Sequence, residues 1–110
     1  MTDLAIEKDI QAAEANRYPR ITPADLDANI VHTEIVKHIT HSGQVLRWAI
    51  LTTCNGFAVT GRPSASVSPL NDNAEIGDAV AIENAKNELW PLMGYELRSK
   101  LAVIENLKGQ

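Results

Sequence analysis

Residues 44–60 constrain the fold more than any other stretch of this chain. Asn55-Gly56 interrupts an apolar and β-branched run, and such a pair favours a tight hairpin turn because both residues accept a positive φ. The sequence therefore predicts a strand over Gln44–Thr53 and a return strand over Phe57–Thr60. Both faces of the first strand are largely apolar, which predicts helices on one side and a partner chain or a further helix on the other. These faces consist of Leu46, Trp48 and Ile50, and of Val45, Arg47, Ala49 and Leu51.

A second strand is predicted immediately before this hairpin. Residues 31–40 are rich in β-branched side chains, which are enriched in strands. His41-Ser42-Gly43 supplies turn residues between this strand and the next. After the hairpin, residues 61–69 are expected to form a loop or an edge strand, because their prolines cannot donate to a ladder.

Helix signals flank the strands. Thr22-Pro23-Ala24-Asp25 places a capping hydroxyl, a proline and an acidic residue in the order that begins a helix, which is predicted to run to about Asn29. Residues 3–15 carry apolar side chains at a loose helical spacing. We therefore expect residues 1–18 to form an N-terminal helix or arm, and residues 19–110 to form a single domain.

Two further helices are predicted at the C-terminal end. Asn71-Asp72-Asn73 offers capping residues for a helix over residues 74–89, and Pro91 is expected to end it. Leu92, Met93, Leu97, Leu101 and Ile104 then recur at a spacing typical of a last helix of about three turns. The predicted fold is a small α+β domain with an antiparallel sheet of about three strands and the Asn55-Gly56 hairpin, packed against helices.

Composition excludes several classes of protein. A chain of 110 residues with 45% hydrophobic and 22% charged residues suits one soluble globular core. Its net charge of −4 disfavours general DNA binding, which depends on Lys and Arg neutralising phosphates. With no membrane span, no signal-peptide pattern and a single cysteine, Cys54, the chain is expected to stay in the cytoplasm where it is made and not to enter a membrane.

Several short blocks resemble a known family. Trp48, Asn55-Gly56-Phe57, Asn84-Ala85 and Trp90-Pro91-Leu92-Met93-Gly94-Tyr95 occur in the order found in small tailed-phage and prophage proteins of the gp-forty-nine/sixty-six family, over about residues 22–101. The resemblance implies a phage origin and an accessory role. It implies no catalytic residues, because none are established for this family.

Other small phage accessory proteins act by binding, and this analogy sets the functional expectation. We expect a non-enzymatic binding protein, acting in counter-defence by sequestering a nucleotide-type immune signal or a host protein. The alternative is a structural or assembly adaptor that binds another phage protein. The two-sidedly apolar strand and the few aromatic residues further predict a homo-oligomer.

Chemical constellations are few. His32, Glu34 and His38 would share one strand face, but the sequence places no further ligand for a metal beside them, and a solvated polar face is the simpler interpretation. No Gly-x-Ser-x-Gly turn or phosphate-binding loop is present, so neither an enzyme nor a cofactor is expected.

The candidate binding residues come from the basic middle of the chain and from the C-terminal motif. Arg62 beside Ser64 could hold a phosphate, although decoration of an exposed loop is the favoured interpretation of Arg62. Trp48 and Trp90 are expected in the core. In the alternative, Trp90 and Tyr95 lie at a subunit interface. The residues predicted to contact an anionic nucleotide-like ligand or a host protein are Arg47, Arg62, Ser64, Tyr95 and Arg98.

Overall fold

A computed structural model describes residues 19–109, so the expected helix or arm over residues 1–18 lies outside the described residues. The first helix, α2 (Pro23–Asn29), begins where the sequence predicts. Thr22 Oγ1 accepts a hydrogen bond from Asp25 N at 3.1 Å, and Asp25 Oδ2 accepts one from Thr22 N at 2.9 Å. This reciprocal capping box satisfies two amide donors and confirms the predicted start of α2.

In the described part of the chain, the sheet has four antiparallel strands: β1 (Ile30–Ile39), β2 (Val45–Thr53), β3 (Ala58–Thr60) and β4 (Ser64–Ser66). β1 pairs with one side of β2, from Ile39 opposite Val45 to Ile30 opposite Thr53. β3 and β4 pair in turn with the other side of β2. The α+β fold class is confirmed, and the segment predicted as a loop or edge strand contributes the fourth strand.

The connection between β2 and β3 is built around the side chain of Asn55. Its Oδ1 accepts hydrogen bonds from Thr53 Oγ1 at 2.8 Å and from Phe57 N at 2.9 Å. Gly56 N donates to the carbonyl of Thr53, and Gly56 has a φ of 88°, which a residue without a Cβ adopts readily. The asparagine side chain therefore satisfies polar groups that the tight turn would otherwise leave without partners.

A single long helix, α3 (Ala74–Lys108), replaces the two C-terminal helices predicted from Pro91. Asn73 Oδ1 caps its start by accepting from Ile76 N at 3.0 Å, as expected for the Asn71–Asn73 segment. Pro91 lies inside the helix, so the prediction that it would end there is wrong. Leu89 is buried in the core just before this proline, and Met93 packs against the same core just after it. Because residues before and after Pro91 pack against the core, α3 stays helical through a proline that disfavours helix.

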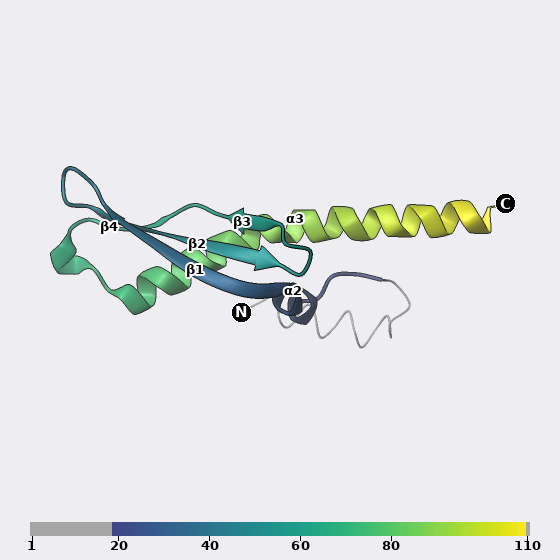
Figure 1. Ribbon diagram of the computed structural model, residues 1–110, viewed down its shortest axis with the longest axis horizontal. Coiled ribbons are helices and arrows are strands. Elements are labelled where there is room, and N and C mark those ends of the chain that lie inside the picture. Colours follow the sequence, from purple (N-terminus) through teal and green to yellow (C-terminus); the bar gives the residue numbers. More distant parts are fainter. Residues whose placement is uncertain (1–18, 110) are drawn as a thin grey trace.

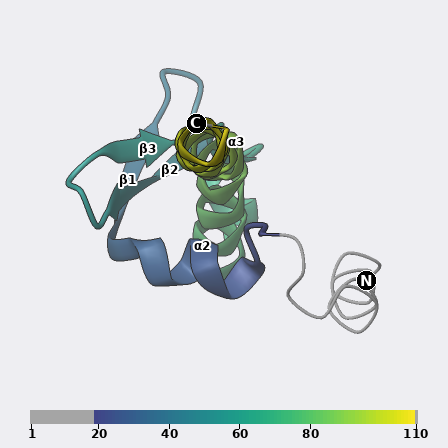
Figure 2. The same cartoon turned by 90° about the vertical axis from the view of Figure 1, so that its right-hand side faces the viewer.

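The core lies between one face of the sheet and the first half of α3. Figures 1 and 2 show α3 running along the sheet, with α2 below it. α3 contacts β2, β3 and β4 far more than it contacts β1. The apolar residues buried in this cluster are Leu26, Ala49, Leu51, Val59, Ala81, Ala85 and Leu89.

The opposite face of the sheet, here called the outer face, carries Leu46, Trp48 and Ile50 of β2 and Val36 of β1. Val36 is opposite Trp48 in the β1–β2 register, so both side chains project from this face. The three β2 residues are only partly buried, Val36 is exposed, and none belongs to the core cluster. Within residues 19–109, no element lies over this face. The sequence predicted apolar character on both faces, and the described residues cover only one of them.

The second half of α3 extends past the sheet, and residues 92–108 are here called the overhang (Figure 1). The overhang makes the molecule elongated, with a radius of gyration of 18.0 Å and extents of 61 × 30 × 19 Å. A compact domain of this length would have a radius of gyration of about 13 Å. Among the described helices, α3 included, none has the length and apolar character needed to cross a membrane.

Candidate functional site

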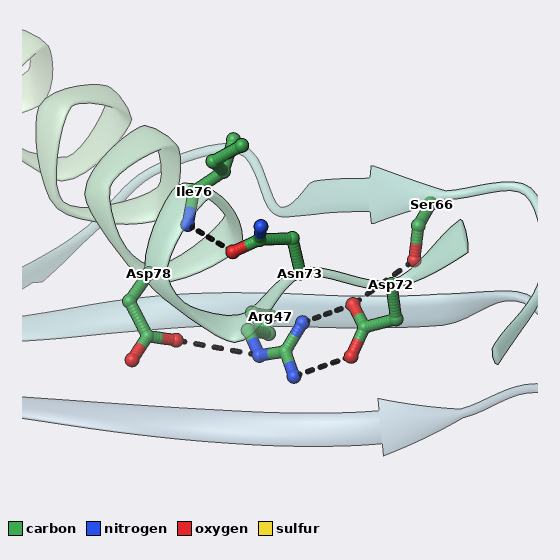
Figure 3. Close-up of polar contacts among 6 residues, drawn as sticks. All are labelled: Arg47, Ser66, Asp72, Asn73, Ile76 and Asp78. Carbon is green, nitrogen blue, oxygen red and sulfur yellow. Dashed lines mark hydrogen bonds and ion pairs between the residues drawn. The ribbon is translucent and has the colours of Figure 1, made fainter. Parts of the chain in front are cut away.

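A buried arginine, Arg47, projects from β2 toward the start of α3 and is surrounded by polar side chains (Figure 3). The Arg47 guanidinium donates from Nη1 to Asp72 Oδ1, and from Nη2 to Asp72 Oδ2 at 2.7 Å. Its Nε lies 3.3 Å from Asp78 Oδ1, and Ser66 Oγ donates to Asp72 Oδ1 at 3.1 Å. Arg47, Ser66, Asp72 and Asp78 are called the Arg47 cluster.

The sequence explains why the Arg47 cluster forms here. Arg47 occupies an inward-facing position of β2, between the buried Val45 and Ala49, and only 5% of it is exposed. A buried guanidinium requires compensating charge, which Asp72 and Asp78 supply from the beginning of α3. At Gly77, a Cβ would lie 3.0 Å from Arg47 Nη1, so a small residue lets the first turn of α3 cover the cluster closely.

The electrostatics of the cluster favour cations over anions. One guanidinium faces two carboxylates, which gives a net charge of −1. The hydrogen bond from Arg47 lowers the pKa of the Asp72 carboxyl below its usual value, and the hydrogen bond to Asp72 raises the pKa of Arg47. Asp72 therefore stays ionised and occupies the bidentate edge of the guanidinium that a phosphate would need.

The five predicted binding residues lie in three different places. Arg47 and Ser64 line the same pocket and are both buried there. Arg62 is exposed between β3 and β4, where its carbonyl accepts a hydrogen bond from Asn84 Nδ2 at 3.0 Å. Tyr95 and Arg98 belong to the overhang.

The two predicted binding residues in the overhang differ in their surroundings. Tyr95 is 78% exposed. Arg98 donates to Glu105 on the same helix, with Nη2 and Oε2 3.0 Å apart.

The sequence did not single out Asp72 as a partner of Arg47. The signal that could have found it is the isolated charge in an otherwise apolar inward row of β2.

A second cavity, the turn groove, opens between the β2–β3 connection and α3, with a volume of about 260 Å³. Among the described residues that line it, most are uncharged, and Glu96 is the one charged side chain. A groove with a single carboxylate and no basic group gives an anionic ligand no charged partner. The lining residues are Asn29, Thr53, Asn55, Phe57, Leu89, Leu92, Met93 and Glu96.

The third surface is β1 itself. All of its residues after Ile30 are exposed, and in the described part of the chain no strand pairs with its outer side. Thr40 N donates to the carbonyl of Gln44 at 2.8 Å. From this bond onward, every second residue of β1 hydrogen-bonds to β2, and the residues between them point their amides and carbonyls away from β2. By this alternation, the outward-facing amides and carbonyls belong to Thr33, Ile35, Lys37 and Ile39. β1 thus presents an open edge of unpaired backbone groups.

These observations describe a small α+β protein whose buried polar centre is an internal ion-pair network and whose open surfaces are a strand edge, a sheet face and a projecting helix. Residues 21–101 match the Phage protein (N4 Gp49/phage Sf6 gene 66) family, and the chain belongs to that family. The family expected from the sequence motifs is confirmed. No curated protein and no solved structure matches the chain.

Proposed function

We propose that this phage protein is a non-enzymatic accessory protein that binds another protein by pairing with the open edge of β1. The single observation that carries the proposal is the length and openness of that edge. Ten residues form β1, whereas soluble proteins keep edge strands short or covered, because unpaired edges recruit other strands. An extended segment of a partner protein would hydrogen-bond to the backbone of Thr33, Ile35, Lys37 and Ile39.

Side chains beside this edge would give the pairing specificity. Ile35 and Ile39 face the same side as α3, yet α3 lies over the other strands and leaves them 37% and 52% exposed. A partner strand with apolar residues at alternate positions would cover both. The partner is therefore proposed to be an extended, alternately apolar protein segment.

The charge distribution gives less support to the nucleotide form of the counter-defence hypothesis. Arg47 is engaged by Asp72 and Asp78, and Arg98 by Glu105. The protein form of the hypothesis requires neither cation. We therefore propose a host protein as the target, in a counter-defence role. An assembly role, with another phage protein as the target, is the alternative.

Capture from infected cells with a matched pair of variants tests the proposal. Lys37→Pro removes an outward amide without removing a bond of the β1–β2 ladder, whereas Lys37→Ala removes the same side chain and keeps the amide. We expect the wild-type protein and Lys37→Ala to capture the same partner after crosslinking, and Lys37→Pro to lose it at least tenfold. Equal capture by both variants, each with wild-type circular dichroism, would contradict pairing at this edge.

The identity of the captured partner decides between the two roles. A host protein supports counter-defence, and a virion component supports the adaptor role. Calorimetry with cyclic nucleotides and ADP-ribose derivatives is the complementary measurement. Binding heat in that titration, together with no strand-dependent partner, would overturn the proposal in favour of nucleotide sequestration.

A further inference from the structure

Among residues 19–109, part of a helix has no sheet beneath it and one face of the sheet has no helix over it. After Met93, which packs against the core, the overhang carries further apolar side chains at helical spacing: Leu97, Leu101 and Ile104. The outer face carries Leu46, Trp48, Ile50 and Val36 with nothing described above them. A stable layered domain buries both kinds of surface.

We propose that the occupant of each surface is a second copy of this chain, so that two copies form a twofold dimer. In this dimer the overhang of each copy lies across the outer face of the other. The interface is isologous, because each copy gives one helix and receives one. This inference is independent of the strand pairing proposed above, because it leaves the outer edge of β1 open.

The overhang is long enough to cover the outer-face row. It has 17 residues and would span about 25 Å as a helix. The row from Leu46 to Ile50 of β2 would span about 13 Å as a strand. A helix of this length can therefore cover the apolar row from Leu46 to Ile50.

Charge does not oppose the contact between copies. The protein carries a net charge of −4, so most of its surface repels a second copy. Residues 92–107 of the overhang contain two basic and two acidic side chains and are neutral: Arg98, Lys100, Glu96 and Glu105. The overhang is thus among the segments that a second copy can approach without net repulsion.

Sedimentation of the full chain and of charged variants tests the dimer. Leu97→Lys and Val36→Lys each put a charge into one half of the interface, outside the core of the single copy. Both are expected to weaken dimerisation at least tenfold. Ser99→Lys adds the same charge to the opposite side of the overhang and should leave the dimer intact. A wild-type chain that sediments as a monomer at micromolar concentration, or equal behaviour of all three variants, would overturn the proposal.

Cysteine crosslinking distinguishes this dimer from one in which two overhangs pair with each other. In a Cys54→Ser background, Val36→Cys and Leu101→Cys are made in separate chains and then mixed under mild oxidation. The proposed dimer yields a mixed disulfide-linked species from the two chains together and little from either alone. Rapid crosslinking of Leu101→Cys with itself, without a mixed species, would show helix-to-helix pairing and contradict the proposal.

Discussion

Arg47 in β2 and Asp72 just before α3 form a two-point charged pair that joins the middle of the sheet to the start of the long helix. The pair is nearly enclosed: the side chain of Arg47 is 6% exposed and that of Asp72 is 15% exposed. Removing one member of such a pair leaves the other charged and poorly solvated. The cluster is therefore expected to stabilise the fold.

Asp72→Asn should lower the melting temperature by more than about 5 °C, because the guanidinium then faces only Asp78. Arg47→Met should also destabilise, since it leaves two carboxylates together. Glu83→Gln, at an exposed position of α3, is the control and should leave the melting temperature within about 1 °C of wild type. Differential scanning calorimetry makes the measurement. An unchanged melting temperature for Asp72→Asn would contradict a stabilising role.

The lowered pKa of Asp72 predicts an acid sensitivity with a definite sign. A carboxyl whose pKa is lower in the folded state contributes stability above its unfolded value, near 3.8, and loses it as the pH falls through the folded pKa. Wild-type stability should therefore fall below about pH 4, and Asp72→Asn should show a shallower fall in that range. Urea unfolding at pH 7 and at several pH values below 4 measures both slopes. Parallel slopes would contradict the prediction.

Gly61 marks a place where the chain passes directly against α3. A Cβ at this position would lie 2.7 Å from Ala85 N and closer still to the carbonyl of Asn84. Gly61→Ala should therefore destabilise the protein by roughly 1 to 3 kcal/mol, because helix backbone cannot move aside cheaply. Gly94→Ala is the matched substitution: a Cβ there meets nothing within 4 Å, and alanine favours a helix by about 1 kcal/mol. Chemical unfolding of both variants should give shifts of opposite sign.

Pro91 should be replaceable without loss of the fold. It is exposed within α3, where proline costs roughly 3 kcal/mol relative to alanine. Pro91→Ala is expected to raise the free energy of unfolding by about 1 to 3 kcal/mol and to leave the helical circular dichroism signal intact. A less stable variant would indicate that the path of α3 around position 91 is needed for packing Leu89 and Met93 together.

Local signals in the sequence predicted most of the elements. The Thr22 cap, the β-branched run before His41 and the cap at Asn73 each depend on neighbouring residues, and the structure confirms them. Pro91 was misread because its local effect is outweighed by distant packing. The spacing of apolar residues along a helix does not show which residues of the sheet they will contact.

The candidate site was predictable only in part. Arg47 and Ser64 were both named as contacts of a ligand, and the structure places them in the lining of one pocket. The role given to Arg47 depended on its being available to a ligand, which only the approach of Asp72 and Asp78 decides. Spacing along β2 shows that the side chain points inward, but it does not show which carboxylates meet it.

The continuity of α3 has a consequence for how this protein can diversify. Residues up to about Met93 are held by the core, whereas most of those after it are exposed. Substitutions in the distal part therefore cost little folding stability and are tolerated by selection unless a partner depends on them. Among relatives in other phages, sequence drift in this part of the helix would accordingly record changes of partner, while the proximal part would record the demands of the fold.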